Sequence, residues 1–178
     1  MLVAIAKFYA KDAGVTKNIE IDETANVESG PFAAYSIKKD IYLVMVDIKT
    51  GKLNHQAFQK YNVINSFAHE KKHDEDHKTA QPLYHVDAIL TQIDHKSFSK
   101  TETEFKQAMG GYAATLLNEA LQKGASLSSV KDKMEEVNKS KLGSFISLVY
   151  DEKSKEVIKI NLEAGVIVTG TRKKKSKN

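Results

Sequence analysis

Histidine recurs at every fourth position in the segment from Phe67 to His77, which reads FAHEKKHDEDH. Its first part, from His69 to His73, has the form H-E-x-x-H. On a helix this spacing places both imidazoles on one face, about one turn apart, where they can bind one zinc ion. Glu70 projects about 100° further around the helix, so it can reach a water on the ion without being a ligand. The pattern predicts a zinc centre with His69 and His73 as ligands and Glu70 as general base.

The third protein ligand that a catalytic zinc ion usually has is expected from the segment after the motif. His85 and Asp87 are the candidates there, in PLYHVDAILTQIDH at 82–95. A tight turn before Pro82 would bring Asp87 nearer to the level of His73, whereas imidazole is the more usual partner in a histidine-rich site. We therefore predict His85 as the third metal ligand and keep Asp87 as the alternative.

The other histidines and two tyrosines are less favoured candidates for the site. His77 lies about two helical turns from the first histidine of the motif, roughly 12 Å, so it is expected to be a surface or supporting residue. His55 and His95 are expected to be surface residues. Tyr84 and Tyr112 are candidates for stabilising negative charge near the metal, although Tyr112 is more simply interpreted as a contact between helices.

The charged run around the motif allows a second interpretation, in which no metal is bound. Both x positions are lysine, Lys71 and Lys72, and the residues that follow are mostly charged. Such a helix end is typical of a solvent-exposed surface. On a helical wheel His69 and His73 lie away from the apolar stripe, so their face could line a cleft or be exposed to solvent. We favour the zinc centre because a glutamate occupies the position that the general base requires.

The predicted elements around these residues change in type along the chain. Residues 1 to about 53 are predicted to be β-rich, from the runs LVAIAKFY, KNIEID, FAAYSI and DIYLVMVDI. From about 54 to 140 the apolar period becomes helical. Four helices are predicted, at about 54–78, 83–94, 101–123 and 129–138. A capping box from Thr101 to Glu104 is expected to open the third, and Gly124 to end it.

The last predicted element is a β-hairpin at 145–162, FISLVYDEKSKEVIKINL, with a polar turn at 152–155. The fold class is therefore predicted to be α+β, with an N-terminal β-rich segment, a helical middle that carries the H-E-x-x-H helix, and a C-terminal β-hairpin. Residues 1–170 are predicted to form a single domain, and 171–178 a basic, disordered tail.

The composition is that of a globular domain and excludes several other classes. The chain has 178 residues, of which 41% are hydrophobic and 28% charged, and it has no cysteine. Bound zinc must therefore use nitrogen and oxygen ligands. The net charge of +4 is modest, and the basic tail has no interleaved aromatic residues, so nucleic-acid binding is not predicted.

No feature of the sequence predicts a membrane segment or a secretory signal. The apolar runs are far shorter than the roughly 20 residues that a membrane-spanning helix needs. The N-terminal segment lacks the basic region and the long apolar region of a signal peptide. Localisation is left open, and export would need another route or a larger parent chain.

The segment NVINSFAHEKKHDEDH, followed by HVDAILTQIDHKSFSKTETEFKQ, resembles the zincin-like metallopeptidases. In particular it looks like small H-E-x-x-H domains of bacterial polymorphic toxins and secreted effectors, whose polar H-x-S-F/W loop is matched from His95 to Phe98. The resemblance covers about residues 40–110. It implies zinc at His69 and His73, Glu70 as the base, and an acidic third ligand where this chain offers His85 or Asp87.

The activity implied by the resemblance is zinc-dependent hydrolysis of a protein or peptide. A cognate inhibitor or immunity protein is an implied partner. The alternative is a non-catalytic domain that binds a metal or a partner through its histidine-rich charged helix.

Overall fold

The computed structural model describes residues 2–24, 32–47, 58–76 and 81–162. The predicted domain boundary at 170 and the predicted tail lie outside these residues. The elements, with η for a 3-10 helix, are α1 (Leu2–Ala10), η1 (Lys11–Ala13), β1 (Ile19–Thr24), β2 (Ala33–Ser36), β3 (Ile41–Asp47), α2 (Lys60–Asp76), α3 (Pro82–Asp94), η3 (Phe98–Lys100), α4 (Thr103–Gln122), α5 (Leu127–Lys139), η4 (Lys141–Ser144), β4 (Ile146–Asp151) and β5 (Glu156–Asn161). The predicted α+β fold class is confirmed.

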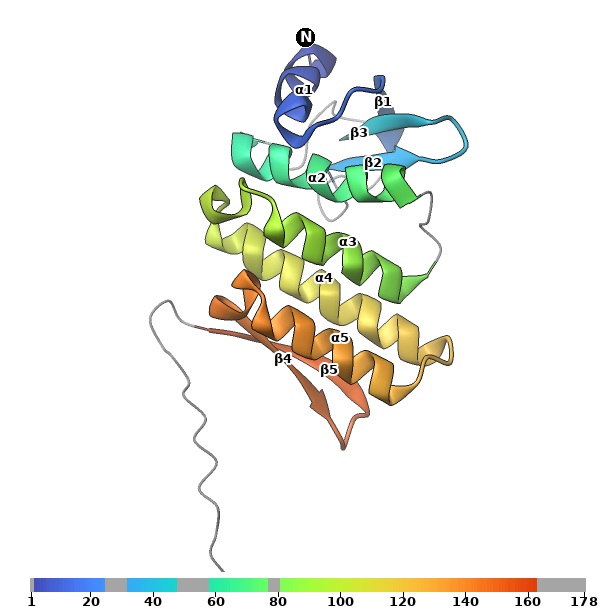
Figure 1. Ribbon diagram of the computed structural model, residues 1–178, viewed down its shortest axis with the longest axis vertical. Coiled ribbons are helices and arrows are strands. Elements are labelled where there is room, and N and C mark those ends of the chain that lie inside the picture. The colour runs from blue at the N-terminus through green and yellow to red at the C-terminus, as the bar shows by residue number, and fades with distance from the viewer. Residues whose placement is uncertain (1, 25–31, 48–57, 77–80, 163–178) are drawn as a thin grey trace, which may run out of the picture.

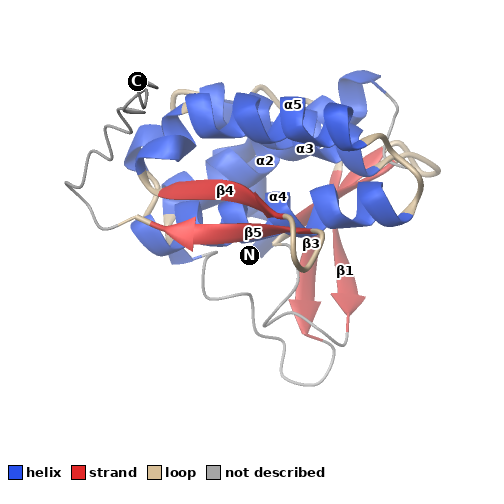
Figure 2. Cartoon of the chain, turned by 90° about the horizontal axis from the view of Figure 1, so that it is seen from below, coloured by secondary structure: helices blue, strands red, loops and turns tan. Residues whose placement is uncertain are grey.

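The molecule is built in layers that follow the chain (Figure 1). A sheet and α1 lie at one end, and the helices α2 to α5 follow side by side, each running opposite to the one before. The hairpin of β4 and β5 covers α4 and α5 at the other end (Figure 2). No helix in the described ranges is both long and apolar enough to cross a bilayer.

The N-terminal sheet has the strand order β1-β3-β2, with β3 parallel to β1 and antiparallel to β2. Three of the four predicted strands are therefore present. The sheet packs on α2 through aromatic side chains: the ring of Phe67, which is fully buried, lies 6.0 Å from that of Phe32 and 6.1 Å from that of Tyr42, between centroids. This packing fixes α2 along the edge strand β2.

The first predicted strand, LVAIAKFY, is wrong, because this run forms α1. A short apolar run fits both a strand and a helix, and tertiary contacts select between them. Ala6 and Ala10 lie one helical turn apart and are buried against the sheet and α2. Their small side chains let the helix pack closely, while Ile5 and Phe8 remain on its exposed side.

The predicted helices are present, with different ends. Among the described residues α2 begins at Lys60, not at 54, and residues 48–57 and 77–80 lie outside the description. The capping box is not formed, since the N-cap of α4 is Glu102 and the hydroxyl of Thr101 donates to the carbonyl of Phe98 instead. The predicted stop at Gly124 is confirmed, with φ of 87° just beyond α4.

The last predicted helix begins two residues earlier than expected, at Leu127, and its N-cap is Ser126. The Ser126 hydroxyl accepts a hydrogen bond from the backbone N–H of Ser129 at 3.1 Å. The hairpin is confirmed, with strands on either side of the turn at 152–155. It lies very close to α4 at Gly110, where an added Cβ would be 2.7 Å from a side-chain carbon of Ile146.

Two asparagines close the outer edges of the hairpin. The side chain of Asn138 accepts from the N–H of Leu148 at 2.7 Å and donates to its carbonyl at 2.8 Å. On the other strand Asn118 makes the same pair of bonds to Val157, at 2.7 and 2.9 Å. Each carboxamide takes the place of a neighbouring strand, so further strands cannot pair at these positions.

Replacing Asn138 by leucine should destabilise the fold by about 1–3 kcal/mol, because two backbone groups of Leu148 lose their partners. Chemical denaturation measures this free energy of unfolding. Asn161→Leu, at an exposed position of the same hairpin, is the matched control and should change stability little. Equal losses in the two variants would show that the carboxamide does not stabilise the edge.

Candidate metal centre

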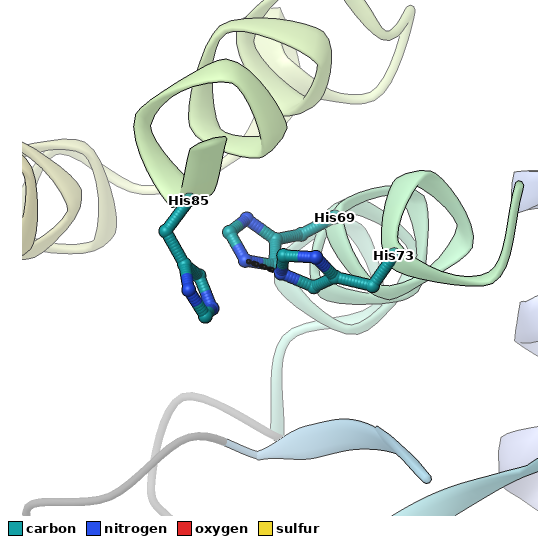
Figure 3. Close-up of side chains that lie close together, drawn as sticks. All are labelled: His69, His73 and His85. Carbon is teal, nitrogen blue, oxygen red and sulfur yellow. Dashed lines mark hydrogen bonds between the residues drawn. The ribbon is translucent and has the colours of Figure 1, made fainter. Parts of the chain in front are cut away.

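Three imidazoles converge between α2 and α3 (Figure 3). His69, His73 and His85 each offer a ring nitrogen, and these nitrogens all lie within 4.8 Å of one another. The Nε2 atoms of His69 and His73 are 3.1 Å apart. The ring centroid of His85 lies 4.3 Å from that of His73 and 5.6 Å from that of His69. Among the described residues this is the group of side chains arranged to hold a metal ion.

The first two histidines are buried, which argues against the interpretation of their helix face as solvent-exposed. His69 is 6% exposed and His73 is 1% exposed. One face of α2 packs on the sheet, and its polar face packs on α3, so the helix is covered on both sides. The polar stripe that holds the histidines lies between the two hydrophobic clusters of the described residues.

The charged residues around the motif are largely paired with one another. Lys71 and Lys72, at the x positions of H-E-x-x-H, form ion pairs one turn further along with Glu75 and Asp76. Asp74 accepts hydrogen bonds from the side chains of Lys17 at 2.5 Å and Tyr42 at 2.8 Å. The last of these bonds holds the end of α2 against the sheet.

His85 and Asp87 point to different neighbours on α3. They are two residues apart, so their side chains project about 200° apart around the helix. His85 joins the imidazole cluster, while the carboxylate of Asp87 pairs with the amine of Lys133 on α5 at 2.7 Å. The geometry favours His85 as the third ligand.

Burial keeps the imidazole of His69 neutral, as a metal ligand must be. The pKa of His69 is lowered to about 3, first by burial and then by the neighbouring rings of His73 and His85. The Nδ1 atom of His69 lies 3.2 Å from the side-chain oxygen of Gln92 on α3. Nothing in the sequence singled out Gln92, since a glutamine in a helix carries no pattern of its own.

Glu70 follows His69 on α2 and is not a member of the cluster. Its Oε2 accepts a hydrogen bond from the backbone N–H of Tyr35, on the edge strand β2, at 2.8 Å. Burial raises the pKa of Glu70 to about 8, and the bond from Tyr35 acts in the opposite direction. A cation bound nearby would favour the ionised carboxylate. The carboxylate of Glu70, the residue after His69 on α2, is thus bonded to the edge strand of the sheet.

The two candidate tyrosines differ in their surroundings. The hydroxyl of Tyr84 donates to Asp76. Tyr112 on α4 is 45% exposed, and its ring centroid lies 6.1 Å from that of His85. The pKa of Tyr112 is raised by burial and also by the charge of Glu70, which lies near it. The contact of Tyr112 with His85 joins α4 to α3 at the edge of the cluster.

Of the remaining histidines, His95 lies in the described part of the chain and is not a member of the cluster. His95 was expected at the surface, but it is partly buried, its pKa is lowered by burial, and its Nδ1 lies 2.8 Å from the Ser97 hydroxyl. Ser97 and Phe98, which follow it between α3 and α4, are buried. His55 and His77 lie outside the described residues.

The fold and this cluster define an α+β domain with a candidate three-histidine metal centre, in which the partly buried Glu70 follows the first histidine in sequence. The chain belongs to the metallopeptidase toxin 2 family, whose model matches residues 1–149. The match confirms the resemblance to metallopeptidase toxins and extends it from about 40–110 to nearly all of the described elements. No curated protein and no solved structure matches the chain significantly.

Proposed function

We propose that this domain is a zinc-dependent peptidase that hydrolyses a protein or peptide. The observation that carries the proposal is the convergence of His69, His73 and His85, with Glu70 next to His69 on the same helix. Membership in a family of metallopeptidase toxins supports a peptidase acting as a toxin.

The donor set fits zinc. Zinc commonly takes three imidazole nitrogens at about 2.0–2.1 Å and keeps a fourth position open, which separates neighbouring nitrogens by roughly 3.4 Å. The 3.1 Å between the Nε2 atoms of His69 and His73 is close to that value. Zinc held by these residues supplies a Lewis acid, which lowers the pKa of a coordinated water and polarises a carbonyl group.

Glu70 acts as the general base. Its carboxylate accepts a proton from the attacking water and then passes it to the leaving amine. The Tyr35 N–H engages Oε2, which holds the group in place and leaves Oε1 to take the proton. To Tyr112, which is half exposed and in ring contact with His85, we assign donation of its hydroxyl to the negative charge that develops on the carbonyl oxygen.

A toxin of this kind acts on a protein of the cell that it enters. The cell that makes it needs protection from the same activity, and a cognate immunity protein that covers the metal site would give it. These partners follow from the family and the proposed chemistry, and they define no particular substrate sequence.

Elemental analysis tests the centre and its third ligand together. The protein, purified without a metal-affinity column and supplied with zinc, should hold about one zinc per chain. His85→Ala should lose this zinc because a ligand is removed. Asp87→Asn is the matched variant on the same helix, and it should keep the zinc because it alters only the pair with Lys133.

Two results would contradict these assignments. Wild-type protein that holds no zinc after zinc addition would rule out the zinc centre. Loss of zinc in Asp87→Asn, with retention in His85→Ala, would make the aspartate the third ligand.

A further inference from the structure

We propose that Gln92 is a positioning residue of the metal centre, which holds His69 in the tautomer that turns its free Nε2 toward His73 and His85. The inference rests on the proposed zinc function for its purpose. The hydrogen bond on which it depends is present in the protein without metal, so the two can be tested separately.

The direction of the bond between Gln92 and His69 determines the tautomer. Gln92 Oε1 can only accept, so Nδ1 of His69, 3.2 Å away, must carry the proton. A neutral imidazole has one N–H, which leaves a lone pair on Nε2. That atom lies 3.1 Å from Nε2 of His73. A proton on Nε2 instead would place a donor where a metal ligand is needed.

The hydrogen bond between Gln92 and His69 is buried, so it favours one tautomer of His69 strongly. Gln92 is 6% exposed and His69 is 6% exposed, so water does not compete freely for either group. Breaking a buried hydrogen bond of this kind leaves an unsatisfied polar group, so the other tautomer of His69 is disfavoured. The imidazole is thus held in orientation as well as in protonation.

A second set of hydrogen bonds holds Gln92 at the level of the cluster. The side-chain nitrogen of Asn65, one turn before His69 on α2, donates to the backbone carbonyl of Gln92 at 2.9 Å. It also donates to the hydroxyl of Ser97 at 3.0 Å. Asn65 is fully buried, so it joins α2 to α3 and to the loop after α3 at one point.

The loop completes this arrangement through His95. Since the Ser97 hydroxyl accepts from Asn65, its own proton is free to go to His95 Nδ1, 2.8 Å away. The backbone N–H of Ser97 donates to the same nitrogen at 3.2 Å. The H-K-S-F segment thus has a physical role: it fixes Asn65, which fixes the helix that carries Gln92.

The experiment compares two substitutions at position 92 with a control on the same helix. Gln92→Met has a similar length and no acceptor, whereas Gln92→Glu keeps an oxygen that can accept from His69. Ile93→Met is the control, because Ile93 packs into the core cluster of α3, α4, α5 and the hairpin, and such a swap of similar volume is well tolerated. Zinc affinity is measured by competition with a chromophoric chelator. The tautomer of His69 in the metal-free protein is read from its ring ¹⁵N shifts by NMR.

We expect the Nδ1–H tautomer at His69 in the wild type. Gln92→Met should mix the tautomers and weaken zinc binding by roughly 10–100-fold, the usual effect of removing a partner of a metal ligand. Gln92→Glu should keep both the tautomer and the affinity, and Ile93→Met should match the wild type.

Three results would overturn the inference: an Nε2–H tautomer in the wild type, unchanged zinc affinity in Gln92→Met, or equal weakening in Gln92→Met and Gln92→Glu. The last would mean that packing, and not the acceptor, matters at position 92. If Gln92→Met does not fold, the inference is still tested by the tautomer of His69 in the wild type and by the zinc affinity of Gln92→Glu. A wild-type protein that binds no zinc but has the Nδ1–H tautomer would reject the proposed function and leave the positioning bond intact.

Discussion

Glu70→Gln should keep zinc affinity nearly unchanged while hydrolysis falls by roughly 10²–10⁴-fold, the usual contribution of a general base. Glu70 is adjacent to the imidazole cluster and not a member of it, so the amide removes no ligand. The amide oxygen can still accept the N–H of Tyr35, so the contact between α2 and β2 survives. What is lost is the ability to take a proton from water.

The measurement pairs zinc content with cleavage. A peptide library made from a proteome digest serves as substrate, with new termini counted by mass spectrometry, because it assumes no cleavage sequence. Glu75→Gln is the matched control: it is the same change on the same helix, at an exposed residue whose partner is Lys71. It should keep both zinc and activity.

Loss of zinc in Glu70→Gln would make the glutamate a ligand or a structural residue, and the proposed mechanism would be wrong. Full activity in Glu70→Gln with zinc bound would instead favour the alternative of a metal site without a catalytic role.

His73→Ala should lose zinc and activity together. His73 is 1% exposed and its Nε2 faces that of His69. Alanine therefore removes one of the three protein ligands of the proposed zinc ion. Dialysis of the wild type against a chelator should have the same effect on activity. Added zinc should restore the chelated wild type and leave the variant inactive.

The control for this variant is a core substitution of similar size away from the cluster. Met134→Ala, in the cluster formed by α3, α4, α5 and the hairpin, should cost about 2–5 kcal/mol of unfolding free energy and still bind zinc. A His73→Ala protein that retains zinc at the wild-type level would remove His73 from the ligand set. Loss of zinc in both variants would mean that instability, and not a missing ligand, explains the result.

Local sequence was enough to define the part of the candidate site that lies on one helix. The spacing of His69, Glu70 and His73 determines their relative directions, because a helix turns by about 100° per residue whatever surrounds it. The same periodicity located α3 and restricted the third ligand to two residues. The hairpin at 145–162 could also be predicted from local sequence, because two runs of alternating apolar and polar residues flank a polar turn.

Tertiary structure decided what neighbouring elements cover or select. The run LVAIAKFY is short and apolar enough for either a strand or a helix, and contacts of Ala6 and Ala10 with the sheet and α2 made it a helix. A helical wheel could not show whether the polar face of α2 is exposed to solvent or buried. In the structure α3 packs on this face and buries His73.

The choice between His85 and Asp87 depends on the rotation of α3 between α2 and α5. One side of that helix meets the imidazoles, and the other meets Lys133, which pairs with the aspartate. Gln92 is likewise defined only by what it touches. Helical periodicity determines the direction of a side chain from its own axis, but the partner that it meets is set by long-range packing, and no local pattern encodes that packing.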